Sequence, residues 1–202
     1  MISLVFSAIS ILGPIIILVP QIRRIITKKS IEGLDLKGLK MGITATFGWL
    51  IYGISSNLWL ISLANVIGIV LLIWIANLFT KVDAQVQFRS FVFLPLGYSI
   101  ALLLLSSQST FLVGLICSLV SSIGPLFQVV RVFKDLNLFG LSATTYINAI
   151  LVHISWIFYG FQKSDPFVFL PNFYGISIAS LLLLRILKSR MQKVGSSARI
   201  PS

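Results

Sequence analysis

The chain alternates between long apolar stretches and short polar segments. A helix that crosses a membrane needs about 20 mostly apolar residues. Seven stretches reach or approach that length, over residues 4–26, 39–54, 58–79, 91–106, 111–133, 142–160 and 167–187. Seven such helices use about 140 residues, which leaves room only for short loops and a tail. The pattern predicts an all-α membrane protein with seven transmembrane helices.

The composition supports this interpretation. Hydrophobic residues make up 57% of the 202 and charged residues only 10%, with a mean hydropathy of +1.01, whereas soluble chains carry about 25% charged residues. Cys117 is the single cysteine and His153 the single histidine. An internal disulfide and a zinc, haem or iron–sulfur site are therefore excluded, and we expect no cofactor and no metal.

The net charge of +11 follows the predicted topology. When the N-terminus is placed outside and the spans alternate, all 16 lysines and arginines except Lys163 lie on the inner side. This positive-inside pattern predicts an outer N-terminus and a cytosolic C-terminus. We expect the protein in the cell (plasma) membrane. Residues 1–21 carry no charged side chain, unlike the start of a cleaved signal peptide.

The basic residues flank the spans and so form no nucleic-acid surface. We expect them to contact membrane lipid.

The chain contains an internal repeat at one constant offset, the shift that brings Gln21 onto Gln128. The matching pairs are Gln21 and Gln128, Arg24 and Arg131, Gly33-Leu34 and Gly140-Leu141, Trp49 and Trp156, Tyr52-Gly53 and Tyr159-Gly160, Asn65 and Asn172, and Gly68 and Gly175. Each unit holds three spans, so two directly joined units would be inverted. The span over residues 91–106 lies between them and restores the direction, which predicts two parallel three-helix repeats joined by a linker helix.

This repeat divides the chain into four parts. They are a first repeat (1–80), a linker with the fourth transmembrane helix (81–110), a second repeat (111–188) and a loose, basic cytosolic tail (189–202). Each three-helix repeat supplies half of the protein. One chain therefore has both halves of a pathway, and whether it forms a homo-oligomer stays open.

Four of the repeated residues reach the same depth. Trp49 and Asn65 lie about 10 and 13 Å below the outer ends of their helices, at 1.5 Å per residue, and Trp156 and Asn172 have almost the same spacing. The middle of a bilayer core lies at about 15 Å. A carboxamide at that depth needs a partner or water, which a central cavity would supply. The alternative is that the asparagines join helices and the tryptophans pack.

The titratable groups and prolines suggest how such a cavity would work. No Asp or Glu lies deep in a span, which favours passive movement over proton coupling. His153 is the exception, and a helix-packing role is favoured over a substrate or proton site. Pro20, next to Gln21, removes a backbone donor and predicts a hinge that closes the inner side, with a static kink as the alternative. In the second repeat Phe127 precedes Gln128, so any hinge there is displaced.

These residues resemble the PQ-loop superfamily, and within it the SWEET and SemiSWEET sugar transporters. The motifs that carry the resemblance are Val19-Pro20-Gln21, Trp49 to Gly53 and Leu63-Ala64-Asn65 in the first repeat, and Trp156 to Gly160, Ser164-Asp165-Pro166 and Leu170-Pro171-Asn172 in the second. The resemblance covers nearly everything except the fourth span and the tail. The second and sixth spans lack prolines that plant and animal members tend to have, so the chain looks like two fused SemiSWEET units.

The resemblance implies a uniporter that moves mono- or disaccharides by alternating access. It assigns the central sugar site to Trp49, Asn65, Trp156 and Asn172. It also places Tyr52, Tyr159 and Asp165 at the outer gate. A basic residue and an Asp also occur at that gate in the family, and Lys163 and Asp165 of the second repeat match them. Residues 55–57 of the first repeat do not match, so we expect no symmetric ionic lock there.

Two rival functions remain on this evidence. A PQ-loop carrier of amino acids would need a charged anchor, which the core lacks. A receptor or assembly protein of the same fold would transport nothing. An enzyme is the least favoured class, because no nucleophile–base pair or carboxylate dyad occurs near the central level.

Overall fold

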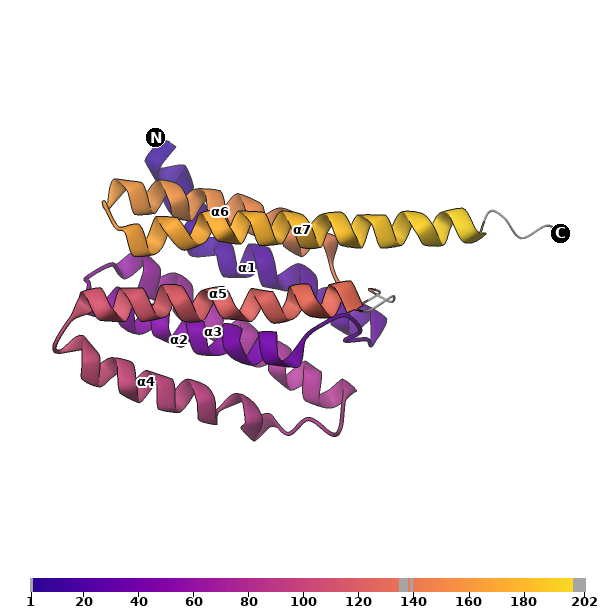
Figure 1. The fold of residues 1–202 in the computed structure, drawn as a ribbon, viewed down its shortest axis with the longest axis horizontal. Coiled ribbons are helices and arrows are strands. Elements are labelled where there is room, and N and C mark those ends of the chain that lie inside the picture. Colours follow the sequence, from indigo (N-terminus) through magenta and orange to yellow (C-terminus); the bar gives the residue numbers. More distant parts are fainter. Residues whose placement is uncertain (1, 135–137, 139, 198–202) are drawn as a thin grey trace.

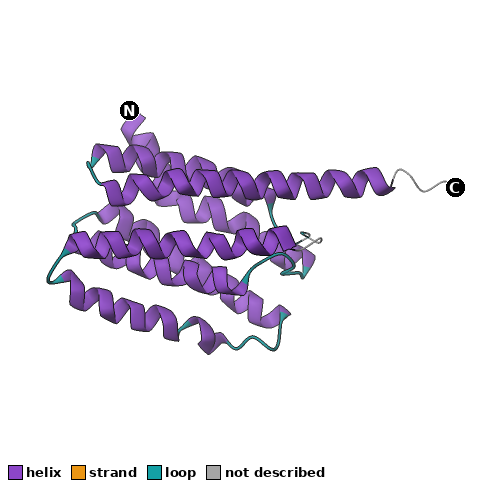
Figure 2. Ribbon diagram, in the orientation of Figure 1, coloured by secondary structure: helices purple, strands orange, loops and turns teal. Residues whose placement is uncertain are grey.

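The computed structural model describes residues 2–134, 138 and 140–197 of the chain. These residues form seven α-helices and a short 3-10 turn, without a strand (Figure 2). The helices are α1 (Ile2–Lys28), α2 (Leu36–Ser55), α3 (Trp59–Val82), α4 (Phe93–Ser106), α5 (Thr110–Lys134), α6 (Ala143–Gln162) and α7 (Pro166–Ser197), with the 3-10 turn η1 (Phe88–Phe91) before α4. The prediction of seven helices is confirmed.

Successive helices run in opposite directions, so the connections gather at two ends of the molecule (Figure 1). We call the end with the α2–α3, α4–α5 and α6–α7 connections the turn end. We call the opposite end, with the α1–α2, α3–α4 and α5–α6 connections, the loop end. Consecutive helices that alternate in this way are the arrangement expected of a polytopic membrane protein with short connections.

Six helices form a closed ring. Within the first repeat α3 packs between α1 and α2, and within the second repeat α7 packs between α5 and α6. The ring is completed by two seams between the repeats, α1 against α6 and α2 against α5. The linker helix α4 lies outside this ring, against α2 and α5 (Figure 1). The two repeats therefore face each other across a common centre.

The repeat extends to the caps and turns. Asp35 caps α2 by accepting a hydrogen bond from Gly38 N at 2.7 Å, and Ser142, at the equivalent position of the second repeat, caps α6 by accepting one from Thr145 N at 3.3 Å. Such side chains satisfy backbone donors that a helix start leaves unpaired. Asn57 and Ser164, which are also equivalent positions, both adopt left-handed backbone in the turns at the turn end, with φ of 57° and 52°.

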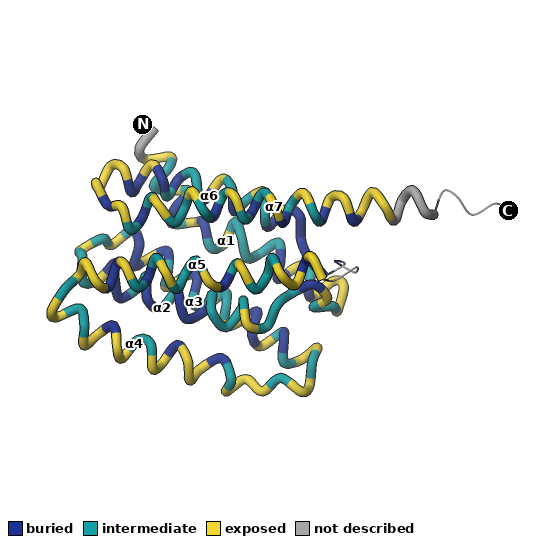
Figure 3. The backbone as a smooth tube through the Cα atoms, in the orientation of Figure 1, coloured by how far each residue is buried: buried dark blue, intermediate teal, exposed yellow. Residues whose placement is uncertain are grey.

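The outside of the ring is apolar. Large hydrophobic side chains are exposed on every helix of the ring and on α4, while the buried positions face inward (Figure 3). Five of the helices in the described chain are long and apolar enough to cross a membrane. The other two, α2 and α6, are the 20-residue helices that carry threonines and other polar residues toward the interior. This surface suits a lipid solvent.

The end of the chain differs from the expected loose tail. Helix α7 continues to Ser197 and projects beyond the other helices (Figure 1). Ser189 is buried, and Arg190 Nη2 donates a hydrogen bond to Leu141 O at 3.0 Å. The sequence from Ser189 to Gln192 holds no proline or glycine, so nothing ends the helix at the membrane boundary. The remainder of the predicted tail, residues 198–202, lies outside the described residues.

Candidate functional site

The ring encloses a cavity of about 530 Å³. All six ring helices contribute to its wall, and α4 does not. Pockets of this size hold small molecules, with a mostly apolar wall and a few polar groups that fix orientation. Trp49, Asn65, Trp156 and Asn172 all line it. The residues that sequence reasoning placed at one depth therefore also face one space.

The two asparagines are oriented by their own helices. Asn65 Nδ2 donates to Ile61 O at 2.8 Å, and Asn172 Nδ2 donates to Val168 O at 2.6 Å. Each bond reaches back one helical turn and so uses one of the two N–H groups of the carboxamide. Among the described residues, Asn65 Oδ1 has no partner, whereas Asn172 Oδ1 lies 2.6 Å from His153 Nδ1. The two half-sites are thus alike in geometry but not in available hydrogen-bonding groups.

The two indoles are held in the same way in each repeat. Trp49 meets the ring of Tyr52 edge to face, with centroids 5.5 Å apart and planes at 84°. Trp156 meets Tyr159 with centroids 5.6 Å apart and planes at 87°. Edge-to-face packing is a favourable arrangement of aromatic pairs. Both tryptophans remain half-buried, so part of each indole is left for a ligand.

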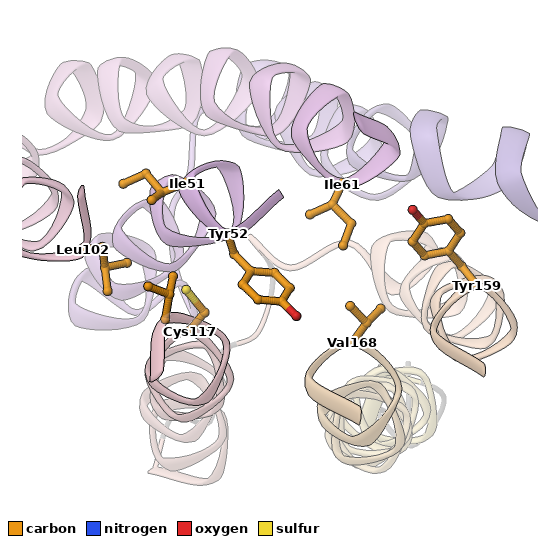
Figure 4. Packing of buried hydrophobic residues seen from close by; sticks show 8 residues of the cluster. Ile51, Tyr52, Ile61, Leu102, Cys117, Tyr159 and Val168 are labelled. Atoms are coloured by element: carbon orange, nitrogen blue, oxygen red, sulfur yellow. The ribbon is translucent and has the colours of Figure 1, made fainter. Parts of the chain in front are cut away.

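Beyond the tryptophans, the turn end is closed by an apolar cluster that joins the repeats (Figure 4). Ile61 and Val168, equivalent positions of the two repeats, both belong to it and are almost fully buried. Tyr52 projects from α2 toward α7 and donates a hydrogen bond from its hydroxyl to Asp165 Oδ2 at 2.7 Å. Asp165 Oδ1 also accepts from the backbone N–H of Phe167 at 3.0 Å, at the start of α7. This carboxylate is therefore held by both repeats.

The hydrogen bonding at the turn end is not symmetric. Position 58, the first-repeat equivalent of Asp165, is Leu58. Tyr159 accordingly makes no hydrogen bond through its hydroxyl to any described residue, although its ring is buried in the cluster. The sequence of residues 55–57 predicts no symmetric ionic lock, and among the described residues only Tyr52, and not Tyr159, bonds to a carboxylate here.

At the loop end, two glutamines bind the repeats together. Gln21 of α1 donates from Nε2 to Gly140 O at 2.9 Å and accepts at Oε1 from Ser142 N at 3.1 Å. Gln128 of α5 donates from Nε2 to Gly33 O at 2.6 Å and accepts at Oε1 from Asp35 N at 3.0 Å. Each glutamine therefore clamps the loop of the opposite repeat. Both side chains also line the loop end of the cavity.

Sequence reasoning identified these glutamines but not their partners. The signal was present, because Gly33-Leu34 and Gly140-Leu141 repeat at the same offset as the glutamines. Gly33 has a φ of +86°, a left-handed conformation that favours glycine, and its carbonyl is the one that Gln128 binds. Pro20, the predicted hinge, lies inside α1, which continues as a helix through it to Lys28.

Comparisons with known proteins agree with this geometry. A family model described as "Sugar efflux transporter for intercellular exchange" matches residues 1–85 and 109–191, the two repeats without α4. The chain is 29% identical to a rat (Rattus norvegicus) sugar transporter SWEET1 over 152 residues, which cover 70% of this chain and 69% of the relative. It is also 29% identical to a sugar transporter SWEET1 of Drosophila pseudoobscura pseudoobscura over 177 residues, covering 80% and 76%.

The fold has a counterpart among solved structures. A eukaryotic SWEET transporter solved at 3.7 Å superposes with a TM-score of 0.65 and covers 95% of this chain and 100% of its own. The sequence identity is 20%, so this likeness shows the arrangement of the helices alone. It agrees with seven helices arranged as three, one and three.

Proposed function

Because the chain belongs to the SWEET family of sugar transporters, an integral membrane family whose model matches both repeats, we propose that it moves mono- or disaccharides by uniport, through alternating access to the central cavity. Members of this family are transporters, which confirms the expectation that the chain is not an enzyme. The observation that carries the proposal is the meeting of two asparagines and two tryptophans around one cavity.

The chemistry of the cavity suits a sugar. A carboxamide offers both donors and an acceptor to hydroxyl groups. The faces of Trp49 and Trp156 suit the C–H face of a sugar ring, and both remain partly open. We propose that these four residues form the substrate site. Asp35 is the single carboxylate among the lining residues of the described chain, and it is occupied as the cap of α2. An amino-acid carrier would need a charged anchor that the middle of the cavity lacks.

Alternating access requires that each end open separately. The turn end is held by Tyr52 and Asp165 together with the apolar cluster that includes Tyr159. The loop end is held by Gln21 and Gln128. We propose that these contacts are the two gates, that one set breaks while the other is kept, and that Pro20 lets α1 bend beside Gln21. The cycle uses no ion, so the sugar moves down its own gradient.

The charge distribution supports one orientation. Within the described part of the chain, the basic residues other than Lys163 lie toward the loop end or beyond it. We therefore propose that the loop end and the C-terminus face the cytosol and that the N-terminus faces outside. We propose separately that the protein resides in the plasma membrane.

Radiolabelled glucose and sucrose uptake into proteoliposomes tests this function. We expect uptake that follows the sugar gradient and is equal at two pH values. An imposed proton gradient should not change the uptake. Asn65→Ala and Asn172→Ala should each reduce flux at least about 10-fold, because a lost pair of hydrogen bonds to a ligand costs that much or more. Asn77→Ala is the matched control, since Asn77 lies on α3 like Asn65 but is exposed and outside the cavity.

Several results would overturn the proposal. Normal flux in both cavity variants would favour a packing role for the asparagines. Flux that follows an imposed proton gradient would rule out passive uniport. Counterflow of amino acids without counterflow of sugars would favour the rival carrier. No flux of either kind, with a stable partner protein recovered, would favour a receptor or assembly protein.

A further inference from the structure

His153 breaks the symmetry of the two half-sites. It stands on α6 where the first repeat has Thr46, at the equivalent position of α2. Thr46 Oγ1 donates a hydrogen bond to Gly42 O of its own helix at 2.8 Å and makes none to Asn65. His153 lies against Gly175, where a methyl group would collide with the imidazole, and bonds to Asn172. The second repeat therefore holds an extra polar group in the cavity wall.

The hydrogen bonds fix which nitrogen of the ring carries the proton. Asn172 Nδ2 donates to Val168 O, so the group that faces His153 is the acceptor Oδ1. His153 Nδ1 must then be the donor of the 2.6 Å bond. In the neutral ring this leaves Nε2 as an acceptor with a free lone pair. His153 thus orients the carboxamide through one nitrogen and keeps the other available.

The second nitrogen has no protein partner. Nε2 makes no hydrogen bond with any described residue. It is not fully buried, so a ligand in the cavity can reach it. His153 lines the cavity, as do Asn65 and Asn172. Two unoccupied acceptors therefore belong to the wall: Asn65 Oδ1 from the first repeat and His153 Nε2 from the second. Acceptors of this kind select ligands that bring hydroxyl donors.

We propose that His153 contacts the sugar, accepting a hydrogen bond at Nε2 from one of its hydroxyls while its Nδ1–H holds Asn172 in place. The inference rests on the proposed sugar transport and deepens it. Since the free acceptor of the first repeat is a carboxamide oxygen on α3 and that of the second is an imidazole nitrogen on α6, which are not equivalent positions, the two halves bind different parts of the sugar. The substrate accordingly lies in one preferred orientation, although the helices around it come from two equivalent repeats.

Two substitutions separate the roles of the two nitrogens. His153→Asn places an amide N–H near the position of Nδ1, so it retains the bond to Asn172 but removes the Nε2 acceptor. His153→Gln places an amide oxygen near the position of Nε2 and removes the donor to Asn172. Ser177→Ala serves as a handling control, because Ser177 is exposed on α7 and bonds to its own helix. Wild type and these three variants should have similar melting temperatures in detergent.

The measurement is competition of glucose uptake by 2-, 3- and 6-deoxyglucose in proteoliposomes. We expect wild type to bind one of these analogues about 3- to 10-fold more weakly than glucose through loss of the hydroxyl that donates to Nε2. In His153→Asn that difference should fall below about twofold, with a raised KM for glucose and a smaller change in maximal flux. In His153→Gln the difference should persist while the KM rises, since the acceptor is kept and Asn172 is released.

Each outcome decides something. Unchanged discrimination among all deoxy sugars in His153→Asn would overturn the contact with sugar and leave uniport intact. An equal loss of flux for every analogue, together with a lowered melting temperature, would show a packing role for His153 and also overturn the inference. Wild type that transports none of glucose, fructose and sucrose would overturn both this inference and the proposed function.

Discussion

Ser10 and Ser155 join α1 to α6 through a 3.1 Å hydrogen bond between their hydroxyls, and both side chains are fully buried. Their equivalents at the other seam, by the offset of the repeat, are Cys117 and Gly48. There Tyr98 of the linker helix α4 reaches into the space above Gly48, and its hydroxyl lies 3.7 Å from Cys117 Sγ. The linker helix thus fills, at one seam, the space that Ser155 fills at the other.

Gly48→Ala should destabilise this seam. A methyl group there would lie 2.7 Å from the Tyr98 ring and 3.1 Å from Cys117 Sγ, so the tyrosine must shift. Overpacking of a close interface costs about 1–3 kcal/mol, which for a chain of this size lowers the melting temperature by roughly 2–10 °C. Thermal unfolding in detergent measures this effect.

Gly97→Ala is the matched control, because no atom lies within 4 Å of its added methyl group. It should leave the melting temperature unchanged or raise it slightly, as alanine favours a helix over glycine. Equal destabilisation by both substitutions would show that the α4–α2 contact contributes no specific packing.

Tyr52→Phe should open the turn end. It removes the 2.7 Å bond that links α2 to the carboxylate of Asp165 across the repeats. Hydrogen bonds to charged groups contribute about 1.5–3 kcal/mol, enough to change the ratio of closed to open states by about 10- to 100-fold. Spin labels at Ser56 and Lys163, on the two turns of the repeats, should show a larger population of long distances.

Tyr159→Phe provides the comparison, because the Tyr159 hydroxyl makes no hydrogen bond to the described residues. Its distance distribution should shift less than that of Tyr52→Phe. Equal shifts in the two variants would contradict the asymmetry of this gate and point to the aromatic rings, not the hydroxyl, as the closing element.

Gln21→Ala and Gln128→Ala should each loosen the loop of the opposite repeat. Gln21 accepts from the backbone N–H of Ser142, and Gln128 accepts from that of Asp35. Loss of one such bond should raise the hydrogen-exchange rate of the amide that made it by about 3- to 10-fold. Exchange monitored by mass spectrometry should therefore increase near Ser142 in the first variant and near Asp35 in the second.

The opposite pattern would exclude the clamp. If Gln21→Ala raised exchange near Asp35 and left Ser142 unchanged, the side chain would act within its own repeat. The two variants control for each other, because each should leave the other loop protected.

The sequence predicted the helices and the repeat well for a physical reason. Crossing lipid forces apolar runs of a fixed length, and a duplicated unit keeps its rare residues at one offset, so both features can be read along the chain. The depth of Trp49 and Asn65 followed from the helical rise. Depth alone does not give rotation about a helix axis, and only the structure shows that both side chains face one cavity.

Contacts between distant segments were not predictable in the same way. The bond of Gln21 to Gly140 and that of His153 to Asn172 depend on how helices pack across a seam or within a repeat, which no local pattern encodes. The prediction of a loose tail from residue 189 differs from the observed helix for another reason. The interpretation ended α7 where the apolar stretch ends, but a helix continues until a residue breaks it, and Arg190 finds a partner on the loop beside it.

That contact gives the last prediction, a comparison of two shortened chains. Removing residues 189–202 deletes the buried Ser189 and the bond from Arg190 to Leu141 O, whereas removing residues 193–202 keeps both. Loss of a hydrogen bond from a charged group and of a buried side chain costs about 1–3 kcal/mol, so the longer deletion should lower the melting temperature by roughly 2–10 °C. The shorter deletion should melt within about 2 °C of wild type. Because Leu141 lies between Gly140 and Ser142, which Gln21 holds, the longer deletion should also raise hydrogen exchange near Ser142 and leave Asp35 protected. Equal stability and equal exchange in the two shortened chains would show that the overhang of α7 does not support the clamped loop.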